Sequence, residues 1–153
     1  MPRAPRVSQA AGFTLMELMV TMAVIALVSS VAAVNVIREI PRYRLTNAAS
    51  QLAWTCRGLR MRAISQHHAV TVMFTSPHVY TVWTDANDNE ISDSGEVQTV
   101  DIHAHAPGVQ LASTANPTFN ATGTVTNVPT ITLTNPSGSK TLTLNILGEV
   151  TIQ

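Results

Sequence analysis

The chain has 153 residues, of which 45% are hydrophobic and only 12% are charged, and its formal net charge is zero. This length accommodates one domain and one further long element, and it excludes two independent globular cores. Soluble domains carry about 25% charged residues, so part of the chain must be strongly apolar. The charges are also separated by sign, because every cation except Lys140 lies at or before Arg62 and seven of the nine acids follow it.

The first long feature is an apolar segment, residues 18–37, which has twenty consecutive residues without a charge. A helix of about this length crosses the hydrocarbon core of a membrane. Arg3 and Arg6 precede the segment without any acid, so the positive-inside rule places the N-terminus in the cytoplasm and the rest of the chain on the other side. The small residues at positions 31–34 could form a cleavage site, so a secretory signal peptide is an alternative to a membrane span.

An acid, Glu17, stands at the edge of this apolar segment. A carboxylate inside a membrane is costly unless it finds a partner, so it is by default a candidate functional residue. The alternative is that Glu17 merely reaches the lipid headgroups. The residues around it, GFTLMELMVTMAVIALV from Gly12 onward, resemble the type III signal of type IV pilins and type II secretion pseudopilins.

This resemblance implies that a prepilin peptidase on the cytoplasmic face cleaves between Gly12 and Phe13, and that the new Phe13 amine is methylated. Residues 1–12 would then be a leader peptide, and residues 13–37 a helix of the membrane and of the filament core. In a filament, Glu17 of one subunit could neutralise the Phe13 amine of its neighbour, which removes two unpaired charges from a core of low dielectric constant. Charge pairing would therefore set the register of the subunits.

Residues 38–66 continue as an amphipathic helix with a period of 3.6. Its apolar stripe is predicted to pack on the rest of the chain and consists of Leu45, Ala49, Leu52, Cys56, Leu59 and Ala63. Pro41 removes one backbone donor but is not expected to end the helix. The single cysteine lies within the stripe, where a small buried thiol is the ordinary interpretation.

The arginines of this helix, among them Arg57, Arg60 and Arg62, could form a nucleic-acid-binding face. Arginines spread along a helix more often form a solvated face or contacts between subunits. We therefore favour a solvated face or subunit contacts over nucleic-acid binding.

From residue 67 to 153 the period changes to two, which predicts an antiparallel β-sheet or sandwich. The predicted strands number about seven and have the sequences VTVMF, VYTVWT, VQTVDIHA, VQLAS, PTFNATG, TITLT and KTLTLNILGEVTI. Two turns are signalled by glycine, in NPSGSK and in LGEV.

The order of these pieces, a long helix, an aromatic strand, a PTFNATGTV segment and a C-terminal hairpin, resembles the GspH/FimT group of minor pseudopilins and minor pilins. The resemblance implies an α+β, type IV pilin-like fold, in which a long N-terminal helix packs on an antiparallel β head. It implies a structural subunit of a type II secretion pseudopilus or a type IV pilus, with other pilin subunits, the prepilin peptidase and an inner-membrane assembly platform as partners. The head would lie in the periplasm, and then in a periplasmic pseudopilus or an extracellular pilus.

Two alternatives are a DNA-binding minor pilin of the FimT type and a major filament subunit. FimT-like proteins of DNA uptake tend to carry arginines around the C-terminal glycine turn, whereas this chain has Glu149 there. An acid repels phosphate, which argues against DNA uptake.

An acidic loop has the ligand spacing of an EF-hand calcium site, with Asp85, Asn87, Asn89, Ile91, Asp93 and Glu96 at positions 1, 3, 5, 7, 9 and 12. Position 6 holds Glu90 where glycine is needed, and the flanking segments are predicted strands. The alternative is a solvated hairpin loop whose side chains cap its own backbone. Apart from this possible calcium ion, no cofactor is expected. The chain carries no catalytic motif, and we expect it not to be an enzyme.

Overall fold

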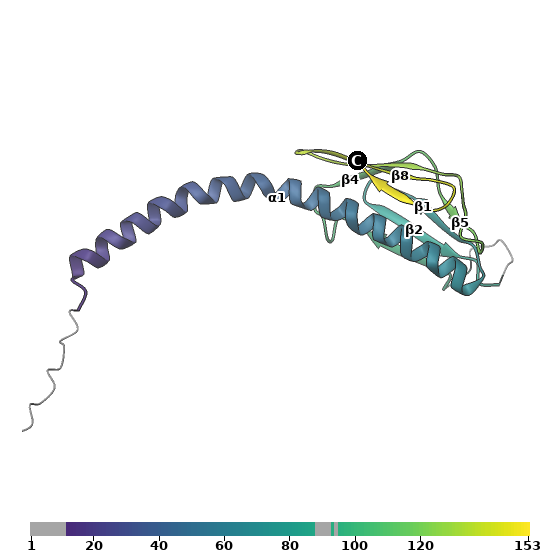
Figure 1. Cartoon of the computed structure of the whole chain (residues 1–153), viewed down its shortest axis with the longest axis horizontal. Helices are drawn as coiled ribbons and strands as arrows, with labels where there is room; N and C mark the ends of the chain where they lie inside the picture. Colours follow the sequence, from purple (N-terminus) through teal and green to yellow (C-terminus); the bar gives the residue numbers. More distant parts are fainter. Residues whose placement is uncertain (1–11, 88–92, 94) are drawn as a thin grey trace, which may run out of the picture. The chain divides into compact units, whose positions relative to one another are not determined.

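The computed structural model describes residues 12–87, 93 and 95–153, and for residues 31–35 and 38 it describes the backbone alone. The chain divides into two compact units, residues 1–38 and 39–153. One helix, α1 (Leu15–Gln66), belongs to both units (Figure 1). The predicted long N-terminal helix is thereby confirmed, and Pro41 lies inside it without ending it. Of the predicted leader, only Gly12 is among the described residues.

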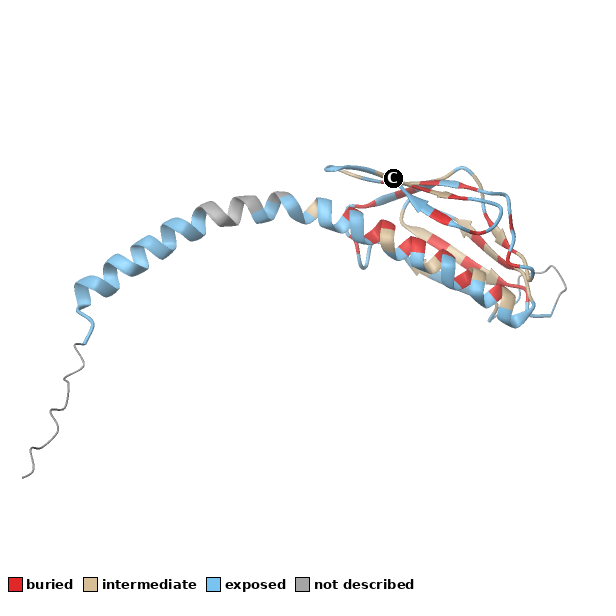
Figure 2. Ribbon diagram, viewed as in Figure 1, coloured by how far each residue is buried: buried red, intermediate tan, exposed pale blue. Residues whose placement is uncertain are grey.

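In the second unit, one face of α1 is buried. All six residues of the predicted stripe are at most 9% exposed, namely Leu45, Ala49, Leu52, Cys56, Leu59 and Ala63. Buried and exposed positions alternate along this part of the helix with the helical period (Figure 2). The start of this unit is also tied to the sheets, because Asn135 Nδ2 donates a hydrogen bond of 2.6 Å to the Pro41 carbonyl.

Nine strands follow α1 among the described residues: β1 (Val70–Phe74), β2 (Val79–Thr84), β3 (Val97–Asp101), β4 (Gln110–Ser113), β5 (Thr118–Phe119), β6 (Val125–Thr126), β7 (Thr130–Asn135), β8 (Gly138–Leu144) and β9 (Val150–Ile152). They form two antiparallel sheets, one with the order β3-β2-β1-β5-β6 and the other with the order β4-β7-β8-β9. Seven strands were predicted; the last predicted run divides into β8 and β9, and the short β6 follows β5. The third predicted strand ends at Asp101 rather than at residue 104.

One hydrophobic core joins α1 to both sheets. In β2 every second residue is buried, which places Tyr80, Val82 and Thr84 on the core side. Phe119 of the first sheet and Leu133 of the second are completely buried. The structure thus confirms the α+β fold class, in which the helix packs on antiparallel sheets.

Both glycine-containing turns occur where they were predicted. The turn between β7 and β8 is closed by Asn135, whose Oδ1 accepts a hydrogen bond from the Ser137 N–H at 2.9 Å. The turn between β8 and β9 contains Gly148, whose φ of +72° lies in the left-handed region that favours glycine.

Over the part of the chain that the structure describes, no helical stretch meets the length and apolarity required to cross a membrane. The membrane span that the sequence predicts over residues 18–37 therefore stays a prediction.

Candidate functional site

The predicted processing and assembly residues lie together at the beginning of α1. Phe13 is 77% exposed, and Glu17 is exposed in the first helical turn. Thr14 immediately precedes the helix, and its Oγ1 accepts a hydrogen bond of 3.2 Å from the Glu17 backbone N–H. This is half of a capping box, which satisfies one of the free N–H groups of the first turn. Thr14 was not among the predicted site residues, although the spacing Thr-x-x-Glu indicates such a cap.

The helix N-terminus carries a partial positive charge, so it stabilises the negative charge of Glu17 even without a partner from another subunit. Its proposed pairing with the Phe13 amine of a neighbour, and the cleavage between Gly12 and Phe13, stay predictions.

The helix of the first unit exposes its apolar side chains to an unusual degree. From Phe13 to Ile37, the large apolar side chains that the structure describes are 50–77% exposed. An apolar surface of this extent marks a site that contacts lipid or other proteins.

Arg60, one of the three predicted nucleic-acid-binding residues, is half-buried between two glycine turns. Its Nε donates a hydrogen bond of 2.8 Å to the Gly123 carbonyl. A Cβ atom at Gly148 would lie only 2.5 Å from Arg60 Cδ, so the backbone of this turn packs directly on the arginine. Arg60 therefore joins α1 to the two turns.

The other two arginines lie on different sides of the helix. Arg57 Nη2 donates to the Val150 carbonyl at 3.3 Å, and its guanidinium carbon lies 5.1 Å from the centre of the Trp54 ring. Arg62 Nε instead donates to Gln66 Oε1 at 3.0 Å, and its side chain is exposed. The three arginines therefore have different roles: Arg57 bonds to β9 and Arg60 to the turn between β5 and β6, whereas Arg62 bonds within α1.

The acidic loop connects β2 to β3 and is organised around Glu96. Its Oε1 accepts a hydrogen bond from the Ala86 N–H at 3.0 Å, and its Oε2 accepts from Trp83 Nε1 and from the Asp93 N–H, both at 3.3 Å. Asn87 Nδ2 donates to Asp93 Oδ2 at 2.9 Å. Glu96 thus caps the backbone of this loop, as the hairpin-loop alternative expects of its side chains, whereas Asn87 and Asp93 bond to each other through their side chains.

Two of the six predicted calcium ligands, Asn89 and Ile91, lie outside the described residues. Asp85 is only 8% exposed, at the end of β2. Within residues 12–87, 93 and 95–153, no three His, Cys, Asp or Glu side chains are grouped so that they could hold a metal ion. The calcium site stays a prediction, which a lower melting temperature on chelation would support.

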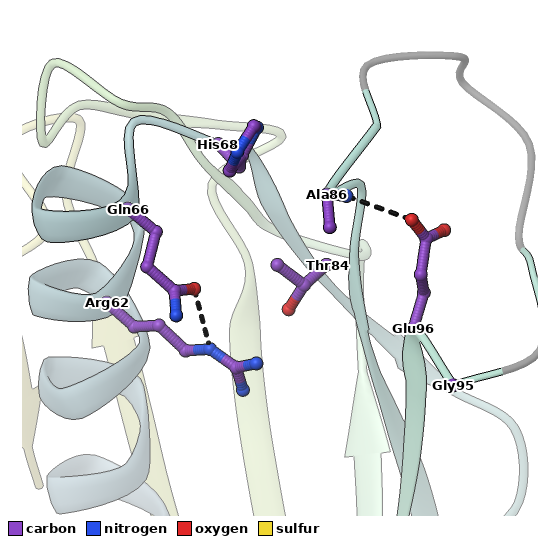
Figure 3. A pocket seen from close by; sticks show the side chains of 7 residues that line it. All are labelled: Arg62, Gln66, His68, Thr84, Ala86, Gly95 and Glu96. Atoms are coloured by element: carbon purple, nitrogen blue, oxygen red, sulfur yellow. Dashed lines mark hydrogen bonds between the residues drawn. The ribbon is translucent and has the colours of Figure 1, made fainter.

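A pocket of about 410 Å³ lies between the C-terminal end of α1 and the hairpin of β2 and β3. Its lining consists of Arg62, Gln66, His68, Thr84, Ala86, Gly95 and Glu96. Figure 3 shows Arg62 and Gln66 on the helix side and Glu96 on the hairpin side, with Thr84 between them. The pocket offers charges of both signs on opposite walls, and Glu96 is already hydrogen-bonded to Ala86.

The single cysteine is part of the core, as predicted, with 1% exposure. Burial raises the pKa of the Cys56 thiol from 9.0 to about 12, so the thiol stays protonated in alkaline solution as well as at neutral pH. Burial also raises the pKa of Tyr80, an effect that a hydrogen bond with Thr55 reduces.

Two family models match the chain. Residues 48–148 match the type II transport protein GspH, and residues 7–33 match the prokaryotic N-terminal methylation motif. The second match contains Gly12, Phe13 and Glu17. No curated protein matches the chain by sequence.

Solved structures similar to this chain include proteins from two organisms. The type IV minor pilin FimU of Pseudomonas aeruginosa is 18% identical, with a TM-score of 0.57 over 73% of this chain and 90% of FimU. The minor pseudopilin EpsH of the Vibrio cholerae type 2 secretion system is 14% identical, with a TM-score of 0.57 over 72% of this chain and 96% of EpsH. At these identities the likeness concerns the fold, which is type IV pilin-like.

Proposed function

The chain belongs to the GspH family of type II transport proteins, and we infer from this premise that it is a minor subunit of a type IV pilin-like filament. In this role, residues 1–12 are a leader that is removed, and residues 13–37 lie first in the membrane and then in the filament core. Residues 38–66 carry the helix into the head, which residues 67–153 complete. The family and the fold are those of structural subunits, and we assign the chain no catalytic activity.

The observation that supports this function best is the exposed apolar surface of residues 13–37. Large apolar side chains there are 50–77% exposed, and each Å² removed from water contributes roughly 25 cal/mol. The proposal supplies partners for this surface, as lipid before assembly and as neighbouring helices afterwards.

The proposed assembly begins with cleavage between Gly12 and Phe13 by a prepilin peptidase, in agreement with the methylation-motif match over residues 7–33. Cleavage creates a positive amine at Phe13, four residues before the Glu17 carboxylate. Each charge would be costly alone in an apolar filament core, and pairing the two charges between neighbouring subunits offsets part of that cost. The inner-membrane assembly platform then takes up only subunits whose charges match.

This proposal is tested by removing the charge of Glu17 while keeping its shape. Glu17→Gln preserves the side-chain oxygen and the Thr-x-x-Gln form of the capping box, so α1 should begin as before. The variant and the wild type are expressed in the organism that encodes the chain. Mass spectrometry reports the N-terminus, and the sheared filament fraction reports incorporation. We expect normal cleavage after Gly12, with incorporation reduced roughly tenfold or more, equivalent to at least about 1.4 kcal/mol.

Glu39→Gln is the matched control, because Glu39 is another exposed acid of the same helix, outside residues 13–37. It should incorporate as the wild type does. Normal incorporation of Glu17→Gln would refute the charge pair and leave Glu17 as a residue that only supports the helix N-terminus. A wild-type chain that still carries Met1–Gly12 in cells with an active peptidase would refute the assembly proposal itself.

The DNA-binding alternative is not favoured by the geometry. Arg57 and Arg60 donate to backbone carbonyls of Val150 and Gly123, so their guanidinium groups already serve the fold of the head. Arg62 instead donates through its Nε to Gln66 of the same helix, and its side chain is exposed.

A further inference from the structure

Two histidine side chains meet where β2 begins and β3 has just ended. His78 immediately precedes β2, and His103 follows the last residues of β3. The centres of the two rings lie 5.3 Å apart, and the ring planes make an angle of 68°. The two residues are far apart in the sequence, so only the antiparallel pairing of β2 with β3 brings them together.

Hydrogen bonds hold the backbone of both histidines. The Ile102 N–H donates to the His78 carbonyl at 2.9 Å, which continues the β2–β3 ladder past the pair of Val79 and Asp101. The His103 N–H donates to Asp101 Oδ1 at 2.8 Å. The two rings are therefore carried by backbone segments whose relative position is fixed.

The His78 ring has one nitrogen engaged and one available. Its Nδ1 lies 3.1 Å from the Val109 carbonyl oxygen. A carbonyl can only accept a hydrogen bond, so we assign the proton to Nδ1, and the lone pair of the neutral ring is then on Nε2. Histidines that bind metals almost always donate their other ring N–H to a carbonyl or carboxylate, which orients the ring. His78 already has this orienting hydrogen bond.

The separation of the rings agrees with the binding of one ion by both. A bound metal lies about 2.0–2.1 Å from a ring nitrogen, and hence roughly 3.2 Å from the ring centre. Two rings on one ion then have their centres about 4.5–5.2 Å apart for tetragonal to tetrahedral geometry, against the 5.3 Å seen here. His103 is exposed, so its ring can rotate to direct a nitrogen at an ion on His78.

The surroundings leave the pair open to solvent and place an acid beside it. His78 is half-buried and His103 is exposed. Asp101, whose carboxylate contacts the His103 backbone, is the single Asp, Glu, Lys or Arg among residues 97–110. Its negative charge favours a cation nearby.

We propose that His78 and His103 bind a divalent transition-metal ion that prefers nitrogen ligands, copper(II) above all. Imidazole nitrogen suits copper, nickel and zinc, and copper(II) binds most tightly in this series, whereas calcium prefers oxygen ligands. Two protein ligands make an open site, whose other positions water or an external ligand fills, and this agrees with the lack of a group of three ligands among the described residues. The site requires no filament and is independent of the proposed function.

The test is a copper(II) titration of the full chain, purified in detergent micelles without a histidine tag and freed of metal. The wild type should bind one ion per chain. His78→Asn keeps an N–H donor for the Val109 carbonyl but removes the ligating nitrogen, and His103→Ala removes the other ring at an exposed position. Each should weaken binding roughly tenfold or more, since even the loss of an orienting partner costs about that much.

His105→Ala is the matched control. His105 is exposed in the same turn, but it lines a small cavity against α1 that neither His78 nor His103 lines. This variant should bind copper(II) as the wild type does. Roughly tenfold excess calcium should not compete, because an ion held by the acidic loop would prefer oxygen ligands. Circular dichroism verifies the fold of each variant, and His103→Ala carries the test if His78→Asn unfolds.

Pulsed electron paramagnetic resonance of the copper(II) complex counts the imidazole ligands. Two should appear in the wild type and one in each ligand variant. Edge-to-face packing also brings two rings to this distance, and if the contact is packing alone, no saturable binding occurs. Absence of saturable binding, equal affinity in the wild type and both ligand variants, a tenfold loss in His105→Ala, competition by calcium, or a single imidazole in the wild-type spectrum would each overturn the site.

Discussion

Substitution of Gly148 by alanine is a sharp test of how the C-terminal turn packs on α1. Gly148 has a φ of +72°, and a Cβ atom there would lie 2.5 Å from Arg60 Cδ and 2.8 Å from Arg60 Nε. Real Cβ atoms do not approach other heavy atoms so closely. Arg60 would have to move, and its 2.8 Å hydrogen bond to the Gly123 carbonyl would be lost or weakened.

Two effects then add to the loss of stability in Gly148→Ala. A left-handed conformation costs an alanine roughly 1–2 kcal/mol. Loss of a hydrogen bond from a charged donor costs about 1.5–3 kcal/mol, and the lower end applies here because Arg60 is only half-buried. We expect the free energy of unfolding to fall by roughly 2.5–3.5 kcal/mol.

The measurement is urea unfolding of a fragment spanning the compact unit 39–153, followed by circular dichroism. Gly108→Ala is the matched control, because its φ of +86° imposes the same backbone cost while no atom lies within 4 Å of its Cβ position. The double variant Arg60→Ala with Gly148→Ala removes the clash, so the two substitutions should be less destabilising together than the sum of the single effects. Equal losses for Gly148→Ala and Gly108→Ala, or strict additivity in the double variant, would refute the packing argument.

Two further predictions concern the core under the helix. Leu52→Ala, at a site that is 3% exposed, should lower the free energy of unfolding by about 2–5 kcal/mol in the same urea assay, whereas alanine at the exposed Gln51 should change it by no more than about 0.5 kcal/mol. The pKa of Cys56 is raised to about 12 from 9.0, so between these pH values the folded state keeps a proton that the unfolded state releases. The contribution of Cys56 to the free energy of unfolding should therefore be constant below pH 9 and fall by on the order of 4 kcal/mol as the pH rises to 12. Urea midpoints measured against pH check this, and a Cys56→Ala variant that shows the same decline would contradict it.

The local features of this protein could be read from its sequence. The period of 3.6 identified six of the eight buried positions of α1 from Leu45 to Ala63, because residues three and four apart share a helical face whatever surrounds them; Ala48 and Ala53 are the other two. The period of two identified the strands, and glycine marked the turn at Gly148. The N-terminal signal around Gly12 is likewise a contiguous string, and the methylation-motif match includes it.

What the sequence left undetermined depends on contacts between distant residues. Strand order is one example: β5 pairs with β1, and β4 joins a different sheet from β3. The arginines are another example. Arg57 and Arg60 donate hydrogen bonds to the carbonyls of Val150 and Gly123, which lie 93 and 63 residues further along the chain, and no local pattern in the sequence indicates these partners. Periodicity indicates which side chains share a face of the helix. Only the packing of the helix on two sheets decides which residue each side chain contacts, and which apolar residues, such as Trp54, stay exposed.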